Sequence, residues 1–302
     1  MVWIVILKFR YPLKEEQLIL SDTESWSEII SPKTNILDLR LREVWRYRDL
    51  LWLFVKRDFI AQYKQTVLGP LWHILQPLFT TIIFLLIFGR IANIPTDGVE
   101  PVLFYMSGIS VWNYFASCLT NTSNTFVSNA AIFGKVYFPR LILPLSIVVS
   151  NIIKLGIQLG LLSILIIWFA SHGTPFQPTL KILLVPILIV IMAGMSLGLG
   201  IIISSLTTKY RDLSILLVFG VQIGLYITPI AYPLSFVNNK KYGLIIEYNP
   251  LTPIVECFRY LIFGKGTFTF QSLGYSFVFT LVVLFMGIII FNKVEKSFMD
   301  TV

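Results

Sequence analysis

Six long runs of apolar residues constrain the fold more than any other feature of this sequence. A helix needs about 20 apolar residues to cross a bilayer, and each run has that length, the fifth only just. Over the chain 56% of residues are hydrophobic and 13% are charged, whereas soluble domains carry about 25% charged residues. We therefore predict an all-α membrane protein with six transmembrane helices. They are expected at about 70–89, 102–120, 142–170, 181–206, 213–231 and 270–292.

The segment at about 43–64 is expected to form an amphipathic helix at the membrane surface. One arc of a helical projection holds Val44, Leu51, Trp52, Val55, Phe59 and Tyr63. The other holds Arg46, Asp49, Lys56, Arg57 and Lys64, interrupted by Leu53 and Ile60. A helix with two such faces lies in the interface plane rather than crossing the membrane. The preceding residues 1–40 are polar and are interpreted as a cytoplasmic lead-in to a membrane domain over 41–302. The first residues of the chain lack the basic start of a signal peptide.

A short turn, Leu68-Gly69-Pro70, joins this helix to the first spanning run. Gly69 can adopt backbone angles that other residues avoid, and Pro70 suits the first turn of a helix. Two interpretations remain: a loop that carries the chain from the surface into the membrane with a role of its own, or a plain helix break.

The distribution of basic residues predicts that both termini lie in the cytoplasm. With the N-terminus inside, 18 of the 24 Lys and Arg residues fall on the inner side and 6 on the outer side. Basic loops remain on the cytoplasmic side. Most of the excess comes from the N-terminal region, so the later runs are oriented by alternation. The net charge of +8 is attributed to this orientation, and no nucleic-acid partner is expected.

The sequence lacks residues that several kinds of function need. No Asp or Glu lies inside the six runs, although ion-coupled carriers usually keep buried carboxylates. There is no G-x-x-x-x-G-K-[ST] phosphate loop and no His or Cys pair at metal-ligand spacing, so we predict no catalytic residues, no metal site and no cofactor in this chain. Cys118 and Cys257 are interpreted as packing residues, and His73 as a polar interface residue. Lys154 either snorkels to the cytoplasmic face or has a function.

Two further patterns concern helix packing and the outer face. Gly156-x-x-x-Gly160 and Gly194-x-x-x-Gly198 are interpreted as sites where helix backbones approach closely. In the outer link, 232–269, a short helix is expected to open at Asn249-Pro250, with Asn249 as its cap and Pro250 in its first turn. Because this helix is apolar and too short to span, we expect it to dip into the outer leaflet and return.

Three stretches, taken in order, resemble the membrane subunit of ABC exporters for lipid-linked polysaccharides such as O-antigen, capsule and teichoic acid. The likeness covers about residues 40–302. The first stretch is Tyr63-x-x-Thr66-x-Leu68-Gly69-x-x-Trp72-x-x-Leu75-x-Pro77, and the second is Phe133-x-Lys135-x-x-Phe138-Pro139-Arg140 with Pro144. The third is Pro229-Ile230-x-Tyr232-Pro233, followed by Asn249-Pro250-Leu251-Thr252 and Glu256-x-Phe258-Arg259.

The resemblance implies a permease without a nucleotide site of its own, in the bacterial inner membrane. It implies a homodimer bound to two copies of an ABC ATPase subunit, which would bind ATP and Mg²⁺. It also implies outer gate helices and a coupling helix in the link 121–141 that meets the ATPase. The coupling residues would be Asn129, Phe133, Lys135, Phe138 and Arg140, and the outer gate would contain Tyr232, Pro233, Asn249, Pro250, Glu256 and Arg259.

The substrate implied by the resemblance is a polysaccharide linked to undecaprenyl diphosphate. Arg57 and Lys64, beside Leu68 and Gly69, are candidates to meet the diphosphate at the cytoplasmic entrance; contact with anionic lipids is the alternative. Aromatic rings can pack on the C–H faces of sugars, but they also gather at membrane interfaces. The candidates for lining the channel are Trp72, Tyr105, Trp112, Tyr114 and Phe115.

Three other functions compete with this one. An exporter of drugs or other lipids belongs to the same superfamily. A membrane glycosyltransferase acting on polyprenyl lipids needs acidic residues gathered at the membrane face, and the acids of the links are isolated. These are Asp97, Glu100, Asp212, Glu247 and Glu256. A structural scaffold is disfavoured by the two non-spanning elements at opposite faces, which suggest a gated path.

Overall fold

The computed structural model describes residues 41–133, 138–173, 180–237 and 243–301, and these form helices joined by short links. All of these residues belong to one compact unit. The predicted cytoplasmic lead-in, 1–40, lies outside the described residues. Within the described part of the chain, the prediction of an all-α fold is confirmed.

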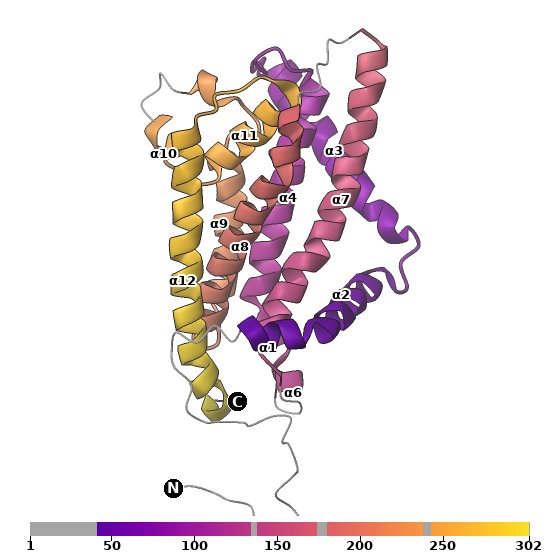
Figure 1. Cartoon of the computed structure of the whole chain (residues 1–302). Coiled ribbons are helices and arrows are strands. Elements are labelled where there is room, and N and C mark those ends of the chain that lie inside the picture. Colours follow the sequence, from indigo (N-terminus) through magenta and orange to yellow (C-terminus); the bar gives the residue numbers. More distant parts are fainter. Residues whose placement is uncertain (1–40, 134–137, 174–179, 238–242, 302) are drawn as a thin grey trace, which may run out of the picture. The chain divides into compact units, whose positions relative to one another are not determined.

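Five described helices are long and apolar enough to cross a membrane. They are the helix over Gly69–Ile91, α4 (Pro101–Ser123), α7 (Ile142–Ser171), the helix over Lys181–Thr207 that contains α8 (Val185–Thr207), and the Phe270–Val294 part of α12 (Phe270–Thr301). The predicted fifth run forms α9 (Leu213–Ile227), which has 15 residues and a length of about 22 Å. That is shorter than the hydrocarbon core of about 30 Å, so the sixth span stays a prediction. Figure 1 shows α9 beside α4 and α8, running between the two ends of the bundle.

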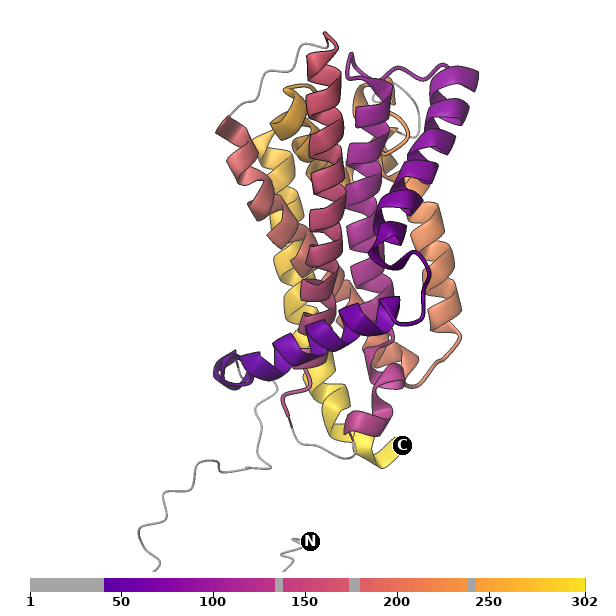
Figure 2. The same ribbon diagram turned by 90° about the vertical axis from the view of Figure 1, so that its right-hand side faces the viewer.

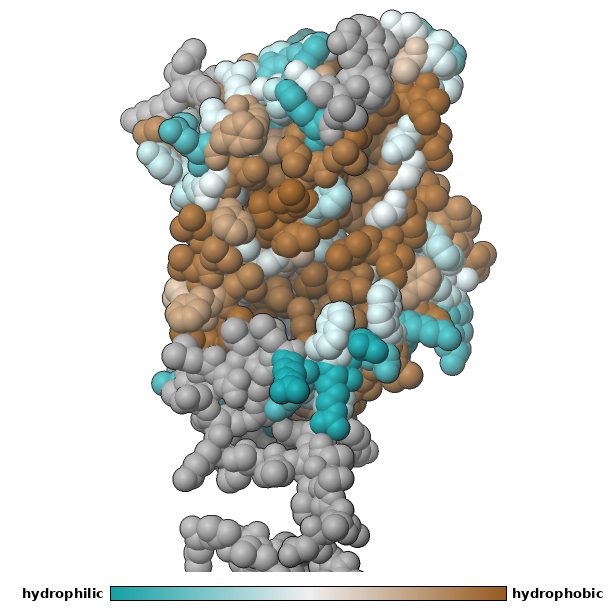
Figure 3. Space-filling model, in the orientation of Figure 1, coloured by the Kyte–Doolittle hydropathy of each residue, from teal (hydrophilic) through white to brown (hydrophobic). Residues whose placement is uncertain are grey.

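Apolar side chains cover the middle of the bundle, as a lipid-facing surface requires. Figure 3 shows this apolar surface, with hydrophilic residues at the end that carries α1 and α2 and at the opposite end. The C-terminal end of α12 lies at the same end as α1 and α2 (Figure 1). The first and last described helices therefore lie at the same end of the bundle, as an even number of crossings requires, while their orientation in a membrane stays a prediction.

The predicted surface helix consists of two pieces, α1 (Leu41–Arg46) and α2 (Arg48–Tyr63), because Tyr47 leaves helical geometry with φ −92° and ψ 21°. Figure 2 shows α2 lying across the spanning helices rather than along them. Val44, Leu51 and Phe54 pack against a cluster of aromatic and aliphatic residues. Trp52 of the predicted apolar arc is 59% exposed, so it does not pack within the bundle, and its contact with a membrane stays a prediction. Trp45, Leu53 and Ile60 are also exposed, because α2 is apolar on more sides than one bundle contact can cover.

The first spanning helix changes its geometry twice. It begins with a 3₁₀ turn over Gly69–Leu71, continues as α3 (Trp72–Phe84), and ends as a π-helix over Leu85–Ile91. Gly69 has φ +49°, a left-handed conformation in which a side chain would be strained. The sequence expectation for the turn at Gly69-Pro70 is therefore confirmed at the level of the backbone.

One of the two small-residue motifs has a visible packing role. A Cβ atom at Gly198 on α8 would lie 2.8 Å from the backbone nitrogen of Leu284 on α12, and one at Gly194 would lie 2.9 Å from Thr280. Gly198 therefore allows α8 to approach the backbone of α12 closely, as the motif predicts, and Gly194 leaves room for the side chains of Thr280 and Leu284. Gly156 and Gly160 have no described atom within 4 Å of an added Cβ, so their motif has no such role inside the described subunit.

The link that is predicted to face outward contains, among its described residues, the short helices α10 (Gly243–Glu247) and α11 (Thr252–Phe263), at the end of the bundle opposite α2 (Figure 1). The expected helix start at Asn249-Pro250 is wrong by two residues, because α11 begins at Thr252. Leu251 directly precedes the helix, and Pro253 rather than Pro250 lies in its first turn. The Asn249 Oδ1 atom accepts a hydrogen bond from the Leu251 N–H at 3.1 Å. Asn249 therefore stabilises the turn before the helix. Most of α11 is buried, and its entry into the outer leaflet stays a prediction.

Candidate functional site

The loop between α2 and α3 joins the predicted surface helix to the membrane. Its turn is held by the Thr66 hydroxyl, which donates to the Tyr63 carbonyl at 2.9 Å. Arg57 is already engaged: its guanidinium pairs with Asp58 at 2.8 Å and lies 4.7 Å from the centroid of the Phe54 ring. Lys64 is exposed, and no ion pair involves it in the described part of the chain. Of the two predicted entrance cations, Lys64 is the more available to an incoming anion.

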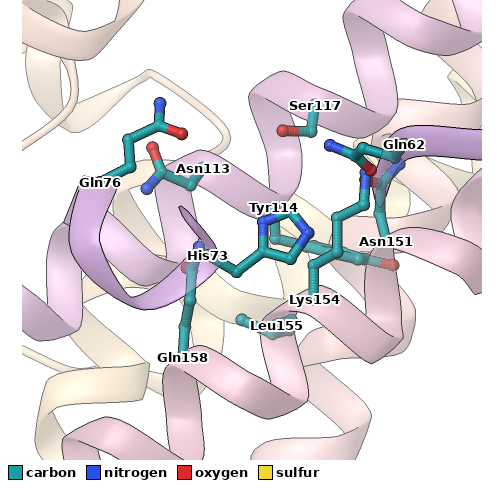
Figure 4. Close-up of a pocket in the computed structure, with 10 residues that line it drawn as sticks. All are labelled: Gln62, His73, Gln76, Asn113, Tyr114, Ser117, Asn151, Lys154, Leu155 and Gln158. Carbon is teal, nitrogen blue, oxygen red and sulfur yellow. The ribbon is translucent and has the colours of Figure 1, made fainter. Parts of the chain in front are cut away.

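A polar pocket, which the sequence interpretation missed, lies between α2, α3, α4 and α7. Its volume is about 120 Å³. Figure 4 shows that the side chains from all four helices surround one space. The lining residues are Gln62 on α2, His73 and Gln76 on α3, Asn113, Tyr114 and Ser117 on α4, and Asn151, Lys154, Leu155 and Gln158 on α7. Nine of these ten side chains are polar, although three of the four helices are otherwise apolar spans.

Sequence spacing carried a signal for this pocket. Asn151, Lys154 and Gln158 follow the i, i+3, i+7 spacing of one helix face. His73 and Gln76 are three residues apart, and Asn113 and Ser117 are four apart. Taken one at a time, His73 is expected at a polar interface, and Lys154 is expected either to snorkel or to have a function. Three polar faces on three neighbouring spans indicate a shared polar space, but only the packing shows that these faces meet.

The link between α4 and α7 is anchored by an aromatic cluster at the α2 end of the bundle. It forms two single-turn helices, α5 (Thr125–Ser128) and α6 (Ala130–Phe133). Phe126 stacks on Phe291 of α12 at 4.9 Å, and Phe133 stacks on Phe138 at 5.8 Å between ring centroids. Phe54 of α2 contacts Phe138 at 5.7 Å. The link is thereby packed against both the surface helix and the last helix.

The described coupling residues are of two kinds: buried aromatic residues that hold the link in place, and polar residues that are only partly buried. Phe133 and Phe138 are 5% and 4% exposed, so they hold the link in place rather than meeting a partner directly. The Asn129 amide donates to the Thr125 carbonyl at 3.0 Å, and the Arg140 guanidinium lies 5.4 Å from the Phe133 ring centroid. Lys135 lies outside the described residues.

A buried ion pair organises the end of the bundle opposite α2. Arg259 and Glu256 on α11 are each 2% exposed, and Arg259 Nη1 lies 3.3 Å from Glu256 Oε1. The guanidinium also donates to the carbonyls of Pro229 at 2.6 Å and Ile230 at 2.8 Å. It lies 3.6 Å from the centroid of the Phe104 ring on α4. Burial lowers the pKa of Arg259 to about 10 while the Glu256 charge raises it, so the group stays charged at neutral pH.

The remaining predicted gate residues contact the same region. The Asn249 amide donates to the Thr228 hydroxyl at 3.0 Å, and the Tyr232 hydroxyl donates to the Tyr226 carbonyl at 2.7 Å. Pro250 accepts a hydrogen bond from the Ser276 hydroxyl of α12 at 2.7 Å, whereas Pro233 directly precedes the short 3₁₀ turn Leu234–Phe236. These contacts connect the end of α9 with α11 and α12. The predicted gate residues therefore lie together, and Arg259 is the most extensively bonded of them.

The five candidate channel aromatics do not share one space within the subunit. Trp112 and Phe115 line a second cavity of about 260 Å³ between α4 and α9, with Leu217, Gly220 and Gly224. Tyr114 faces the polar pocket, and Tyr105 is fully buried beside Phe84 and Phe104. Trp72 is 49% exposed at the start of α3. Among the described residues, no three His, Cys, Asp or Glu side chains come together in a way that could hold a metal ion.

Comparison with known proteins gives a consistent set of matches. The model of the ABC-2 type transporter family matches residues 49–263. An O-antigen export system permease protein, RfbA, from Klebsiella pneumoniae is 30% identical over 254 residues, which cover 83% of this chain and 94% of that protein. RfbA from Myxococcus xanthus is 24% identical over 87% of this chain and 98% of that protein. The polysialic acid transport protein KpsM from Escherichia coli is 24% identical over 81% and 93% of the two chains.

Proposed function

Because the chain belongs to the ABC-2 type transporter membrane family, we propose that it is the permease subunit of an ATP-driven exporter of lipid-linked polysaccharide. The proposed substrate is an O-antigen-like or capsule-like chain carried on undecaprenyl diphosphate across the bacterial inner membrane. The observation that carries this proposal is the match to an O-antigen export permease over 94% of that protein. Since the sequence has no phosphate loop, a partner must bind ATP and Mg²⁺. The proposed assembly is a homodimer of this chain with two ATPase subunits.

The link from α4 to α7 is the proposed contact with the ATPase. Its two single-turn helices are too short to span, and they lie at the same end of the bundle as α2. The aromatic contacts of Phe54, Phe126 and Phe138 join the link to α2 and α12. A displacement of the link by the ATPase would therefore move the surface helix and the last helix together.

The substrate is proposed to enter at the loop from Leu68 to Gly69. Lys64 offers an exposed cation beside this loop, and Arg57 can exchange its pair with Asp58 for a diphosphate oxygen. The absence of a side chain at Gly69 lets a phosphate approach the backbone. Beyond the loop, the cavity lined by Trp112 and Phe115 is the proposed aromatic part of the path, and α11 with its Arg259 contacts is the proposed outer gate.

Deletion of the gene in its own strain tests the function. We expect surface polysaccharide to disappear and lipid-linked polymer to accumulate inside the cell, because synthesis continues without export. A plasmid copy of this gene should restore the surface polymer, but not when the partner ATPase lacks the lysine of its phosphate loop. Unchanged surface polymer, with a new sensitivity to drugs, would instead support the alternative of a drug exporter.

A further inference from the structure

We propose that the polar pocket between α2, α3, α4 and α7 binds the phosphate group of a lipid whose tail lies along α3. The first observation is the chemistry of the lining. Its ten residues include the cation Lys154 and no acidic residue. The amides of Gln62, Gln76 and Asn113 and the hydroxyl of Ser117 add hydrogen-bond donors. A cation among neutral donors is complementary to a phosphate, which offers only charged acceptors.

The second observation is that buried polar atoms in the pocket lack partners. The His73 Nε2 and Gln158 Oε1 atoms make no hydrogen bond within the described part of the chain, and their side chains are 9% and 7% exposed. Buried polar atoms without a hydrogen-bond partner are unfavourable, so water or a polar ligand must satisfy them. After rotation of its amide, Gln158 can donate to the same ligand that Lys154 attracts. A polar ligand in the pocket would remove this penalty.

Lys154 is available to such a ligand. Its side chain lines the pocket and is only partly exposed, and the ion pairs of the described residues do not include it. Asp58 on α2 pairs with Arg57 at 2.8 Å, and no acidic residue belongs to the lining. The charge of Lys154 is therefore not balanced by an acidic residue of the pocket.

The third observation concerns the route into the pocket. Gln62 and Gln76 line the pocket and are exposed, so the space reaches the surface of the subunit between α2 and α3. Gln76, Phe79 and Ile83 follow the i, i+3, i+7 spacing of one face of α3, and Phe79 and Ile83 are 56% and 51% exposed. A polar rim followed by an exposed apolar stripe matches a headgroup followed by its hydrocarbon tail. This continuity favours a lipid over a free anion.

Two lipids share the required chemistry: a phospholipid of the bilayer and a polyprenyl diphosphate. The test uses the full chain, purified with its ATPase in detergent, and native mass spectrometry to obtain apparent Kd values. Two matched pairs separate the sources: polyprenyl diphosphate with polyprenol, and phosphatidylglycerol with diacylglycerol. In at least one pair the phosphate-bearing member should bind at least about tenfold more tightly, since a charge-assisted hydrogen bond of this kind changes affinity by that factor or more. The pair that responds identifies the lipid.

Substitutions link the binding to the pocket. Lys154→Gln should weaken the phosphate-bearing lipid by about tenfold or more, while Lys154→Arg should retain most of the affinity. Lys209→Gln, at an exposed lysine in the α8–α9 turn, is the control and should leave binding unchanged. If Lys154→Gln does not assemble, Gln76→Leu at the exposed rim should still weaken binding by about fivefold.

Two outcomes would overturn the proposal. One is equal binding of both members in both pairs. The other is a Lys154→Gln variant that binds the lipid as tightly as the parent protein. If Lys154→Gln does not assemble, the same result for Gln76→Leu counts instead. Either result would mean that the pocket holds water alone. Because binding is measured on purified protein, this result is independent of the export assay, and either proposal can fail without the other.

Discussion

At the residue scale, Arg259 has the greatest structural consequence among the predicted site residues. Its side chain connects α11, the segment after α9 and the Phe104 ring of α4. Glu256 balances its charge and also accepts a hydrogen bond from the Thr267 N–H at 3.3 Å. The packing around it is tight, because a Cβ atom at Gly108 would lie 2.7 Å from Arg259 Nη2. The geometry thus explains why a charge is tolerated in an apolar surrounding.

Replacing Arg259 should destabilise the protein strongly. Arg259→Ala leaves Glu256 buried without its cation, and loss of one partner of a buried ion pair typically costs about 3–5 kcal/mol. Arg259→Lys should have an intermediate effect, because an ammonium group cannot reproduce the forked contacts to two carbonyls. Thermal unfolding of the purified chain in detergent measures the change, with Arg211→Ala at an exposed position as the control. Equal Tm values for Arg259→Ala and Arg211→Ala would refute the structural role.

The entrance cations give a second prediction at this scale. Replacing Arg57 and Lys64 together by Gln should reduce export strongly, because both charges near Gly69 are lost. Lys64→Gln alone should have the larger single effect, since Arg57 is engaged with Asp58. Surface polysaccharide, at matched membrane levels, is the measurement, and Arg46 and Arg48 replaced together are the control. If the control pair matters equally, these basic residues only hold α2 on anionic lipid.

At the element scale, the contact between α8 and α12 depends on glycine. Gly198 and Gly287 lie so close that an added Cβ on Gly287 would be 2.9 Å from the Gly198 carbonyl oxygen. The neighbouring atoms at Gly198 belong to the α12 backbone, which cannot rotate away as a side chain can. The surface helix α2 and the link after α4 show the opposite arrangement, in which large aromatic rings fill the contact.

Gly198→Ala should therefore destabilise the protein by about 1–3 kcal/mol, the usual range for forced overpacking. Gly160→Ala has no described atom within 4 Å of the new methyl group and serves as the matched control on another spanning helix. Thermal unfolding of both variants in the same detergent tests the difference. A Gly198→Ala variant as stable as the control would mean that α8 and α12 can separate at no cost.

The link after α4 gives the second prediction for an element. Single cysteines placed along residues 124–133 should form crosslinks with cysteines in a groove of the partner ATPase, because the aromatic anchors hold this link at the end of the bundle. The native residues Cys118 and Cys257 are buried and should not react. The absence of crosslinks across the whole scan, in a complex shown to be assembled, would exclude this link as the docking site.

At the scale of the whole molecule, the two ends of the bundle differ in structure. One end carries α2 and the link to α7, and the other carries α10 and α11 (Figure 1). Because α9 is shorter than a usual span, the topology depends on whether α9 crosses the membrane. Five crossings would leave the turn before α9 and the start of α12 on the same side of the membrane, and six would place them on opposite sides.

Cysteine labelling in intact cells decides between these topologies. Lys209→Cys, in the turn before α9, should react only after the membrane is permeabilised. Gln271→Cys, at the exposed start of α12, should react with a membrane-impermeant reagent from outside. Both expectations follow from six spans with cytoplasmic termini. Labelling of both cysteines from the same side would show that α9 does not cross.

The sequence by itself determined the helical class, five of the spans, the helical segment before Gly69 and the turn at Gly69, because hydropathy, length and backbone preference are local properties. It also indicated the family through the motifs around Gly69, Phe138 and Arg259. Only the tertiary structure decided which polar faces meet. Lys154 and His73 are 81 residues apart in the chain, yet both line one pocket. The pairing of Gly198 with α12, and the separation of Tyr114 from Trp112 into different cavities, likewise depend on how neighbouring helices are rotated. Apolar patterning leaves that rotation open, because a lipid-exposed face and a packed face are equally hydrophobic.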